Sequence, residues 1–135
     1  MKQINAEGIA DLINAKVMFQ QNDRFWELVR SAPETIKKMN WILEEINRSP
    51  DNEELYMMII KALPRSGHSL GYFMARTIEE KLGREELVNL VTDPVRFFEA
   101  YNEVADVKFS EDALEVIKNL RDAFKVIHTF DSVEE

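Results

Sequence analysis

The sequence contains no cysteine, only two histidines, and four residues each of glycine and proline among its 135 residues. Without cysteine the chain forms no disulfide and no thiolate metal site, which is typical of a protein kept in a reducing compartment. Glycine and proline are too scarce for a collagen-like or low-complexity chain, and a hydrophobic content of 45% excludes the disordered class. These absences leave a globular protein with few side chains suited to binding a transition metal.

The chain also lacks a long apolar segment and an excess of positive charge. Its longest unbroken apolar run, Leu55 to Ile60, is six residues, whereas a membrane-spanning helix needs about 20. Glu7 and Asp11 interrupt the region where a signal peptide would be apolar. The net charge of −8 excludes nucleic acids and anionic membranes as expected partners. We therefore expect a cytoplasmic location, although a shortened N-terminus would conceal a signal peptide.

Apolar residues recur at steps of three and four, and no segment shows the alternation of a strand. The clearest stripe follows Ser110, which we expect to cap the last helix, and it comprises Ala113, Val116, Ile117, Leu120, Ala123, Phe124, Ile127 and Phe130. The pattern predicts an all-α fold, with residues 1–135 forming one domain built as a bundle of seven or eight helices.

Capping residues and prolines predict where the other helices begin. A helix after Ser31 would bury Ile36, Met39, Leu43 and Ile46. A helix starting at Ser49-Pro50 and ended by Pro64 would bury Leu55, Met58, Ile59 and Ala62. A helix capped by Asp93-Pro94 would bury Phe97, Phe98, Tyr101 and Val104. The remaining helices are expected at Ala6 to Phe19, at Asp23 to Arg30, and at Arg84 to Val91 after a left-handed cap at Gly83.

Gly67, Gly71 and Ala75 are spaced by four, so a helix would carry them on one face. Each glycine inside a helix costs about 1 kcal/mol relative to alanine, which indicates close approach of another helix or of a ligand. Close packing of a helix is the simpler explanation. Alternatively, Gly67 lies in the turn just before this helix.

Two places carry side chains suited to chemistry. His68 stands near a helix N-terminus, where the helix dipole favours a neutral imidazole that could donate to a polarised oxygen. A capping or surface role explains His68 more simply, and His128, near the end of the last helix, is expected to be structural or exposed. Glu7 and Asp11, four residues apart, would share a helix face, and an exposed acidic turn is the simpler explanation for them.

Together, the sequence segments around Glu7 and His68 resemble the C-terminal part of the gluzincin-type zinc-dependent peptidases. The resemblance covers most of the chain from Glu7 to about Ala105, and is carried by Glu7 to Asp11, Gly67 to Ala75, Ile78-Glu79, Leu82-Gly83-Arg84, Leu87, Asp93-Pro94, Phe97-Phe98 and Tyr101-Asn102. It implies that Glu7 is the third zinc ligand and that Asp11 is the carboxylate orienting a ligand histidine. It further implies that His68 or Tyr72 stabilises the oxyanion.

One departure from that family decides what we expect of the chain. The motif His-Glu-x-x-His, which supplies two zinc ligands and the general base, is absent. The sequence therefore predicts a C-terminal fragment or a degenerate relative that has no peptidase activity by itself. Zinc is the cofactor of the family, but we expect none bound by this chain alone, and a peptide substrate only if the missing segment is supplied.

Two other interpretations stay open. The chain could be a helical module for protein–protein interaction or self-association, forming a homo-oligomer without enzymatic activity, with Phe19, Phe25 and Trp26 as the uncovered apolar residues. It could also be a small-molecule-binding bundle that uses Tyr72, Phe73, Phe97 and Phe98, although aromatic residues at helical spacing are more often core.

Overall fold

The computed structural model describes residues 4–5, 9, 23–63 and 67–120, and these are the residues whose structure is discussed below. Their regular elements are all helices: α2 (Asp23–Arg30), α3 (Ala32–Arg48), α4 (Glu53–Ala62), α5 (His68–Leu82), α6 (Arg84–Asn89) and α7 (Pro94–Val104). Residues 111–120 are also helical, as are Ile4, Asn5 and Ile9 near the N-terminus. The expected all-α bundle is confirmed. No helix in the described part of the chain is long and apolar enough to cross a membrane.

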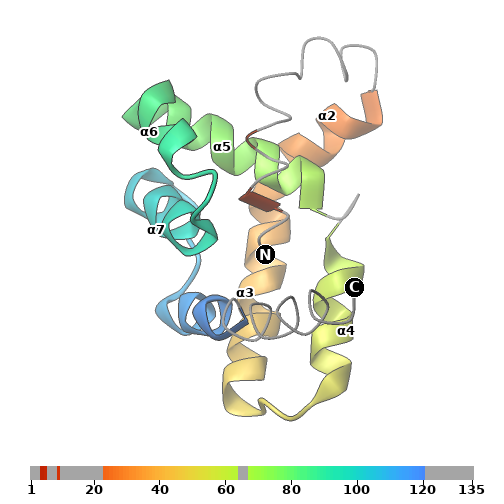
Figure 1. The fold of residues 1–135 in the computed structure, drawn as a ribbon. Helices are drawn as coiled ribbons and strands as arrows, with labels where there is room; N and C mark the ends of the chain where they lie inside the picture. Colours follow the sequence, from red (N-terminus) through yellow and green to blue (C-terminus); the bar gives the residue numbers. More distant parts are fainter. Residues whose placement is uncertain (1–3, 6–8, 10–22, 64–66, 121–135) are drawn as a thin grey trace, which may run out of the picture.

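Helix α3 is the central element of the bundle. Figure 1 shows α4 beside it and α5 across one end, with α7 and the helix of residues 111–120 on the side away from α4. The buried stripe of α3 confirms the predicted positions and adds two more; it comprises Ala32, Ile36, Met39, Ile42, Leu43 and Ile46. Burying one such large aliphatic side chain contributes about 1.5–3 kcal/mol, so α3 is a main source of stability.

Two of the predicted caps are confirmed. The carboxylate of Asp93 accepts a hydrogen bond from the backbone N–H of Arg96 at 3.1 Å, and Pro94 opens α7. The hydroxyl of Ser110 accepts from the backbone N–H of Ala113 at 3.2 Å. Each cap satisfies an amide that has no partner inside its helix.

Ser31 directly precedes α3 as predicted, but the prediction that its side chain caps this helix is wrong. Its hydroxyl donates to the carbonyl of Leu28 at 3.1 Å and makes no capping bond to α3. The reason is that Ser31 is the single residue between α2 and α3, and its backbone (φ −89°, ψ 3°) continues from α2 with its own N–H bonded to the carbonyl of Glu27. A residue that still belongs to the preceding helix is not free to adopt the extended conformation of an N-cap.

The predicted start of α4 at Ser49-Pro50 is also wrong. Asn52 is the N-cap, and its side chain accepts from the backbone N–H of Glu54 at 3.1 Å. Pro50 lies in the preceding turn, where its carbonyl accepts a hydrogen bond from the Tyr56 hydroxyl at 2.9 Å. On α4 itself Leu55 and Ile59 are buried, but Met58 is 37% exposed, since it lies about 100° around the helix from its neighbour Ile59.

The connector of residues 105–110 is held by two asparagine side chains. Asn40 on α3 donates to the carbonyl of Lys108 at 2.8 Å and accepts from the N–H of Ser110 at 3.0 Å. Asn102 on α7 donates to the carbonyl of Phe109 at 2.7 Å and accepts from its N–H at 2.9 Å. A connector cannot pair its own backbone groups as a helix does, so these carboxamides supply the missing partners.

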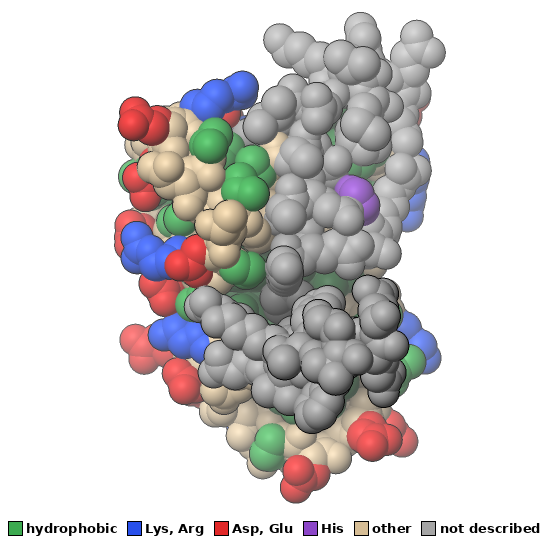
Figure 2. All heavy atoms as spheres, in the orientation of Figure 1, with side chains coloured by type: hydrophobic (Ala, Val, Ile, Leu, Met, Phe, Trp, Pro, Cys, Tyr) green, Lys and Arg blue, Asp and Glu red, His purple; other side chains and the backbone are tan. Residues whose placement is uncertain are grey.

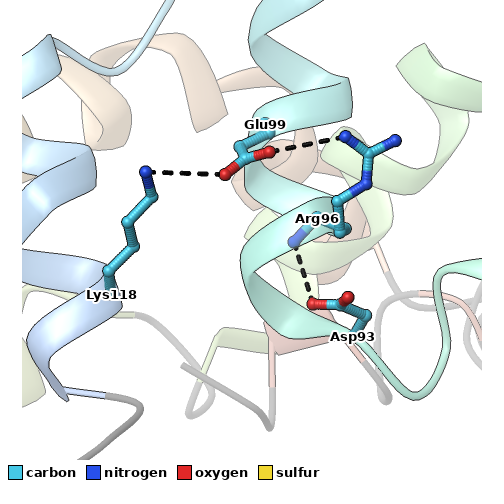
Figure 3. A network of polar contacts seen from close by, with 4 residues as sticks. All are labelled: Asp93, Arg96, Glu99 and Lys118. Atoms are coloured by element: carbon cyan, nitrogen blue, oxygen red, sulfur yellow. Dashed lines mark hydrogen bonds and ion pairs between the residues drawn. The ribbon is translucent and has the colours of Figure 1, made fainter.

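A surface network adds a weaker link between α7 and the last described helix (Figure 3). The carboxylate of Glu99 lies 3.5 Å from the guanidinium of Arg96 and 3.7 Å from the ammonium of Lys118. Because these groups are exposed to solvent, each pair is worth only about 0–1 kcal/mol. In the view of Figure 2, Lys and Arg side chains are dispersed among Asp and Glu side chains around the margin of the molecule.

We expect Asn40→Ala to lower the free energy of unfolding by about 1–3 kcal/mol, because it leaves two backbone groups of the connector unpaired. Asn47→Ala is the matched control: Asn47 is exposed on the same helix and should change stability by less than about 0.5 kcal/mol. Urea denaturation of both variants measures the difference. Equal stability of the two variants would show that Asn40 does not hold the connector.

Candidate functional site

The candidate site lies at the start of α5, where the sequence placed a histidine beside a glycine. His68 is the first residue of α5, and Gly67 is its N-cap with φ 90° and ψ 3°. The alternative that Gly67 precedes the helix is therefore confirmed, while Gly71 and Ala75 lie inside it and are buried. Only glycine adopts a positive φ of this kind without strain.

Gly67 is constrained by a neighbour as well as by its backbone. A β-carbon added to it would lie 2.7 Å from Cγ1 of Ile4, closer than two carbon atoms can approach without displacement. The close approach predicted from the glycine spacing is thus real at this position. The neighbour belongs to the N-terminal segment, whose described residues Ile4, Asn5 and Ile9 are helical and buried.

Asn5 links this segment to the far end of α6. Its side-chain amide donates to the carbonyl of Leu90 at 2.6 Å, while its Oδ1 is buried and has no hydrogen-bond partner among the described residues. The N-terminal segment therefore lies against both Gly67 and Leu90. Glu7 and Asp11, the predicted zinc ligand and its neighbouring carboxylate, lie outside the described residues.

Tyr72 lies one turn after His68 on α5, and its ring belongs to an aromatic cluster with Phe25 and Trp26 of α2. The ring centroids of Tyr72 lie 5.6 Å from Phe25 and 5.3 Å from Trp26, and all three pairs in the cluster meet edge to face. The guanidinium carbon of Arg76, one further turn along α5, lies 5.7 Å from the centre of the Tyr72 ring. Such contacts stabilise packing and fix the ring in place.

This cluster sets the accessibility of the two predicted oxyanion stabilisers. Tyr72 is buried, whereas His68 is only partly buried, so His68 is the easier of the two for a substrate to reach.

The aromatic cluster also corrects the expectation that Phe25 and Trp26 are uncovered apolar residues. Phe25 is completely buried, because α2 packs against α5, and Trp26 is half-buried. Phe19 lies outside the described residues.

The other predicted aromatic residues are core residues. Phe97 and Phe98 are fully buried, and Phe98 packs edge to face on Phe109 at 5.2 Å. Phe73 is partly buried and packs against the same core. A cleft of about 430 Å³ lies elsewhere, against Ile46, Tyr56 and Val116, and the aromatic residues named for a small-molecule site do not line this cleft.

Tyr101 is a buried titratable group that the sequence pattern identified only as core. Its hydroxyl donates to the carbonyl of Val107 at 2.6 Å. Burial raises the pKa of Tyr101 far above its usual value, and the carboxylate of Asp106 raises it further. The phenol therefore stays protonated at neutral pH and supports the connector. This contribution to stability is complete below about pH 10, where the unfolded tyrosine begins to ionise, and declines above it.

The described residues do not fit a zinc ion. They contain no group of three or more His, Cys, Asp or Glu residues able to hold a metal. Protein zinc sites use cysteine, histidine and carboxylate ligands, and a lone carboxamide oxygen such as that of Asn5 does not replace them. The whole chain offers two histidines and no cysteine, and one of them, His128, lies outside the described residues.

Residues 1–108 match the sequence profile of the family described as "Putative zinc dependent peptidase (DUF5700)". The chain belongs to this family. The match spans Glu7, Asp11, His68 and Tyr72, and it agrees with the resemblance to zinc-dependent peptidases at the level of the family. No curated protein and no solved structure matches the chain.

We expect Gly67→Ala to lower the free energy of unfolding by about 2–4 kcal/mol, through backbone strain and collision with Ile4. Gly83→Ala is the control for backbone strain without a collision, since Gly83 (φ 88°, ψ 163°) has nothing within 4 Å of an added β-carbon. It should cost about 1–3 kcal/mol. The cost of Gly67→Ala should shrink in an Ile4→Ala background, whereas that of Gly83→Ala should not. A double-mutant cycle followed by thermal unfolding measures this, and an unchanged cost of Gly67→Ala would contradict the contact.

The aromatic cluster allows a separate prediction for Tyr72. Tyr72→Ala should destabilise the protein by about 3–5 kcal/mol, because it empties the space between Phe25 and Trp26. Tyr72→Phe should cost less than about 1 kcal/mol, since it keeps the ring contacts. Chemical denaturation measures both, and a large loss in Tyr72→Phe would show that the hydroxyl, rather than the ring, is what the fold requires.

Proposed function

We propose that the chain is a helical part, or a degenerate relative, of a zinc-dependent peptidase and that it has no peptidase activity by itself. The observation that carries the proposal is the family match over residues 1–108 in a chain that lacks His-Glu-x-x-His. A catalytic zinc needs three protein ligands and an open position, with a general base beside it. This sequence lacks the motif that would supply two of those ligands and the base.

In this proposal Glu7 is the third zinc ligand of a complete site and Asp11 orients a ligand histidine, both by resemblance to the gluzincin-type peptidases. Among the described residues, His68 is the candidate that would stabilise the oxyanion at this site. His68 opens α5 directly after Gly67, whose backbone lies against Ile4, so this contact fixes the backbone position of His68. A residue whose backbone is held in place loses less entropy when it binds a substrate group.

Of the two candidate oxyanion stabilisers, we favour His68. His68 is only partly buried, and an imidazole N–H can donate one hydrogen bond to a developing oxyanion. The ring of Tyr72 is enclosed by Phe25 and Trp26, so reaching a substrate would require its hydroxyl alone to project from the cluster. A peptide substrate would bind here only when the missing zinc ligands are supplied.

A second function, self-association without enzymatic activity, is favoured by the exposed apolar side chains of Met57 and Ile60 on α4. A cytoplasmic location also belongs to the proposal and is supported by the absence of cysteine.

We expect the purified chain to bind zinc with a dissociation constant weaker than about 10 μM and to show no zinc-dependent hydrolysis of a casein-type substrate. Isothermal titration and a fluorescent casein assay measure the two properties. Glu7→Gln, which removes the charge but keeps the shape, should leave both unchanged in the chain alone.

The proposal fails if the chain hydrolyses casein in a way that needs zinc and is abolished both by a chelator and by Glu7→Gln. His128→Ala is then the informative companion of His68→Ala. Loss of activity in His128→Ala would identify that histidine as a ligand and show that the chain assembles a complete zinc site.

A further inference from the structure

Helix α4 exposes apolar side chains that the rest of the described bundle does not cover. Met57 is 52% exposed and Ile60 is 65% exposed, and Met58 lies beside them. Glu53, Met57, Ile60 and Lys61 are spaced by four, three and one residues, which places them along one stripe of the helix. We call this stripe the α4 outer face. A shallow hollow on the same helix is lined by Glu53, Glu54, Met57, Met58 and Lys61.

The charges on α4 are segregated at its two ends. Glu53 and Glu54 occupy the first turn and Lys61 the last. None of these three side chains forms an ion pair with another residue in the described part of the chain. The outer face therefore presents acid, then apolar side chains, then base, and each charged end is available to a partner.

We propose that two copies of the chain pair through α4, with the two helices antiparallel and the twofold axis at Met57. In this register Glu53 lies opposite Lys61 of the partner subunit. Glu54 lies opposite Ile60 of the partner subunit, and Met57 meets Met57 of the partner subunit at the axis. A twofold interface brings the same surface of both copies together, so it requires exactly such a self-complementary pattern of charge.

The charge pattern favours a second copy over other occupants. Parallel pairing would set the acidic ends against each other, which repels. A basic peptide lying along α4 would meet Lys61 with like charge, and an anionic membrane surface would be repelled by a chain of net charge −8. The antiparallel second copy satisfies both ends at once. Methionine suits the centre, because its flexible thioether side chain adapts to an identical neighbour.

The size of α4 sets the strength of the pairing. Ten residues of helix extend about 15 Å, so the contact is smaller than the roughly 1,200 Å² that stable interfaces bury. We therefore expect a reversible dimer with a dissociation constant on the order of 100 μM. This inference is independent of the proposed peptidase relationship, since it uses no residue of the candidate site.

Sedimentation equilibrium between about 10 μM and 1 mM tests the pairing. The unaltered chain should shift from monomer toward dimer across this range. Met57→Glu, which sets two carboxylates against each other at the axis, should weaken association at least tenfold. Val88→Glu is the matched control, because Val88 is 48% exposed on α6, away from the α4 outer face, and this variant should associate as the unaltered chain does.

Charge reversal tests the antiparallel register. Glu53→Lys and Lys61→Glu should each weaken self-association, by about tenfold, since each turns two attractions into repulsions. An equimolar mixture of the two variants should form heterodimers, because every facing pair is then opposite in sign, and the double variant should associate as the unaltered chain does. A monomer throughout the range, or association that Met57→Glu and the charge reversals leave unchanged, would overturn the proposal.

Discussion

The contact between Gly67 and Ile4 determines how the N-terminal segment packs against the start of α5. At this point a backbone with positive φ passes so close to a buried isoleucine that no side chain can be accommodated. The same contact fixes where α5 begins, and α5 in turn packs against α2, α3, α6 and α7. The position of His68 and the aromatic cluster around Tyr72 both depend on that start. The candidate site can therefore lie this close to the N-terminal segment only because Gly67 has no β-carbon.

Periodicity predicted the helical class, the inward residues of α3 and, apart from the partly buried Val104, those named for α7, because burial of apolar stripes dominates the energy of a bundle. Caps were predictable where a helix begins after an irregular connecting segment, as at Asp93 and Ser110. They were not predictable at Ser31, where two helices join through one residue, or at Asn52, because a proline two residues earlier offered an equally good start. Local sequence does not reveal which of two competing starts the tertiary packing allows. The exposure of Met58 escaped prediction for a different reason, because Met58 lies about 100° around α4 from the buried Ile59.

The candidate site was predicted less completely than the fold. Sequence placed His68 at the start of a helix and indicated a close approach at the glycine-bearing face, and the structure confirms the first statement and, at Gly67, the second. It did not reveal that Tyr72 is enclosed by Phe25 and Trp26, because the sequence of α5 does not indicate which residues of another helix pack against it. The zinc ligands implied by resemblance belong to residues outside the described part, and the family match supports the relationship to peptidases without assigning them roles.

The asparagine side chains that hold the connector also bear on the order in which the bundle forms. Asn40 bonds to Lys108 and Ser110 across 68 and 70 residues of sequence, whereas Asn102 bonds to Phe109 across only seven. The local contact can form as soon as α7 exists, but the distant one must wait until α3 and the chain beyond α7 have met, because closing a long loop costs entropy in advance. Loss of the Asn40 contacts would therefore free the connector from α3 while leaving it attached to α7 through Asn102.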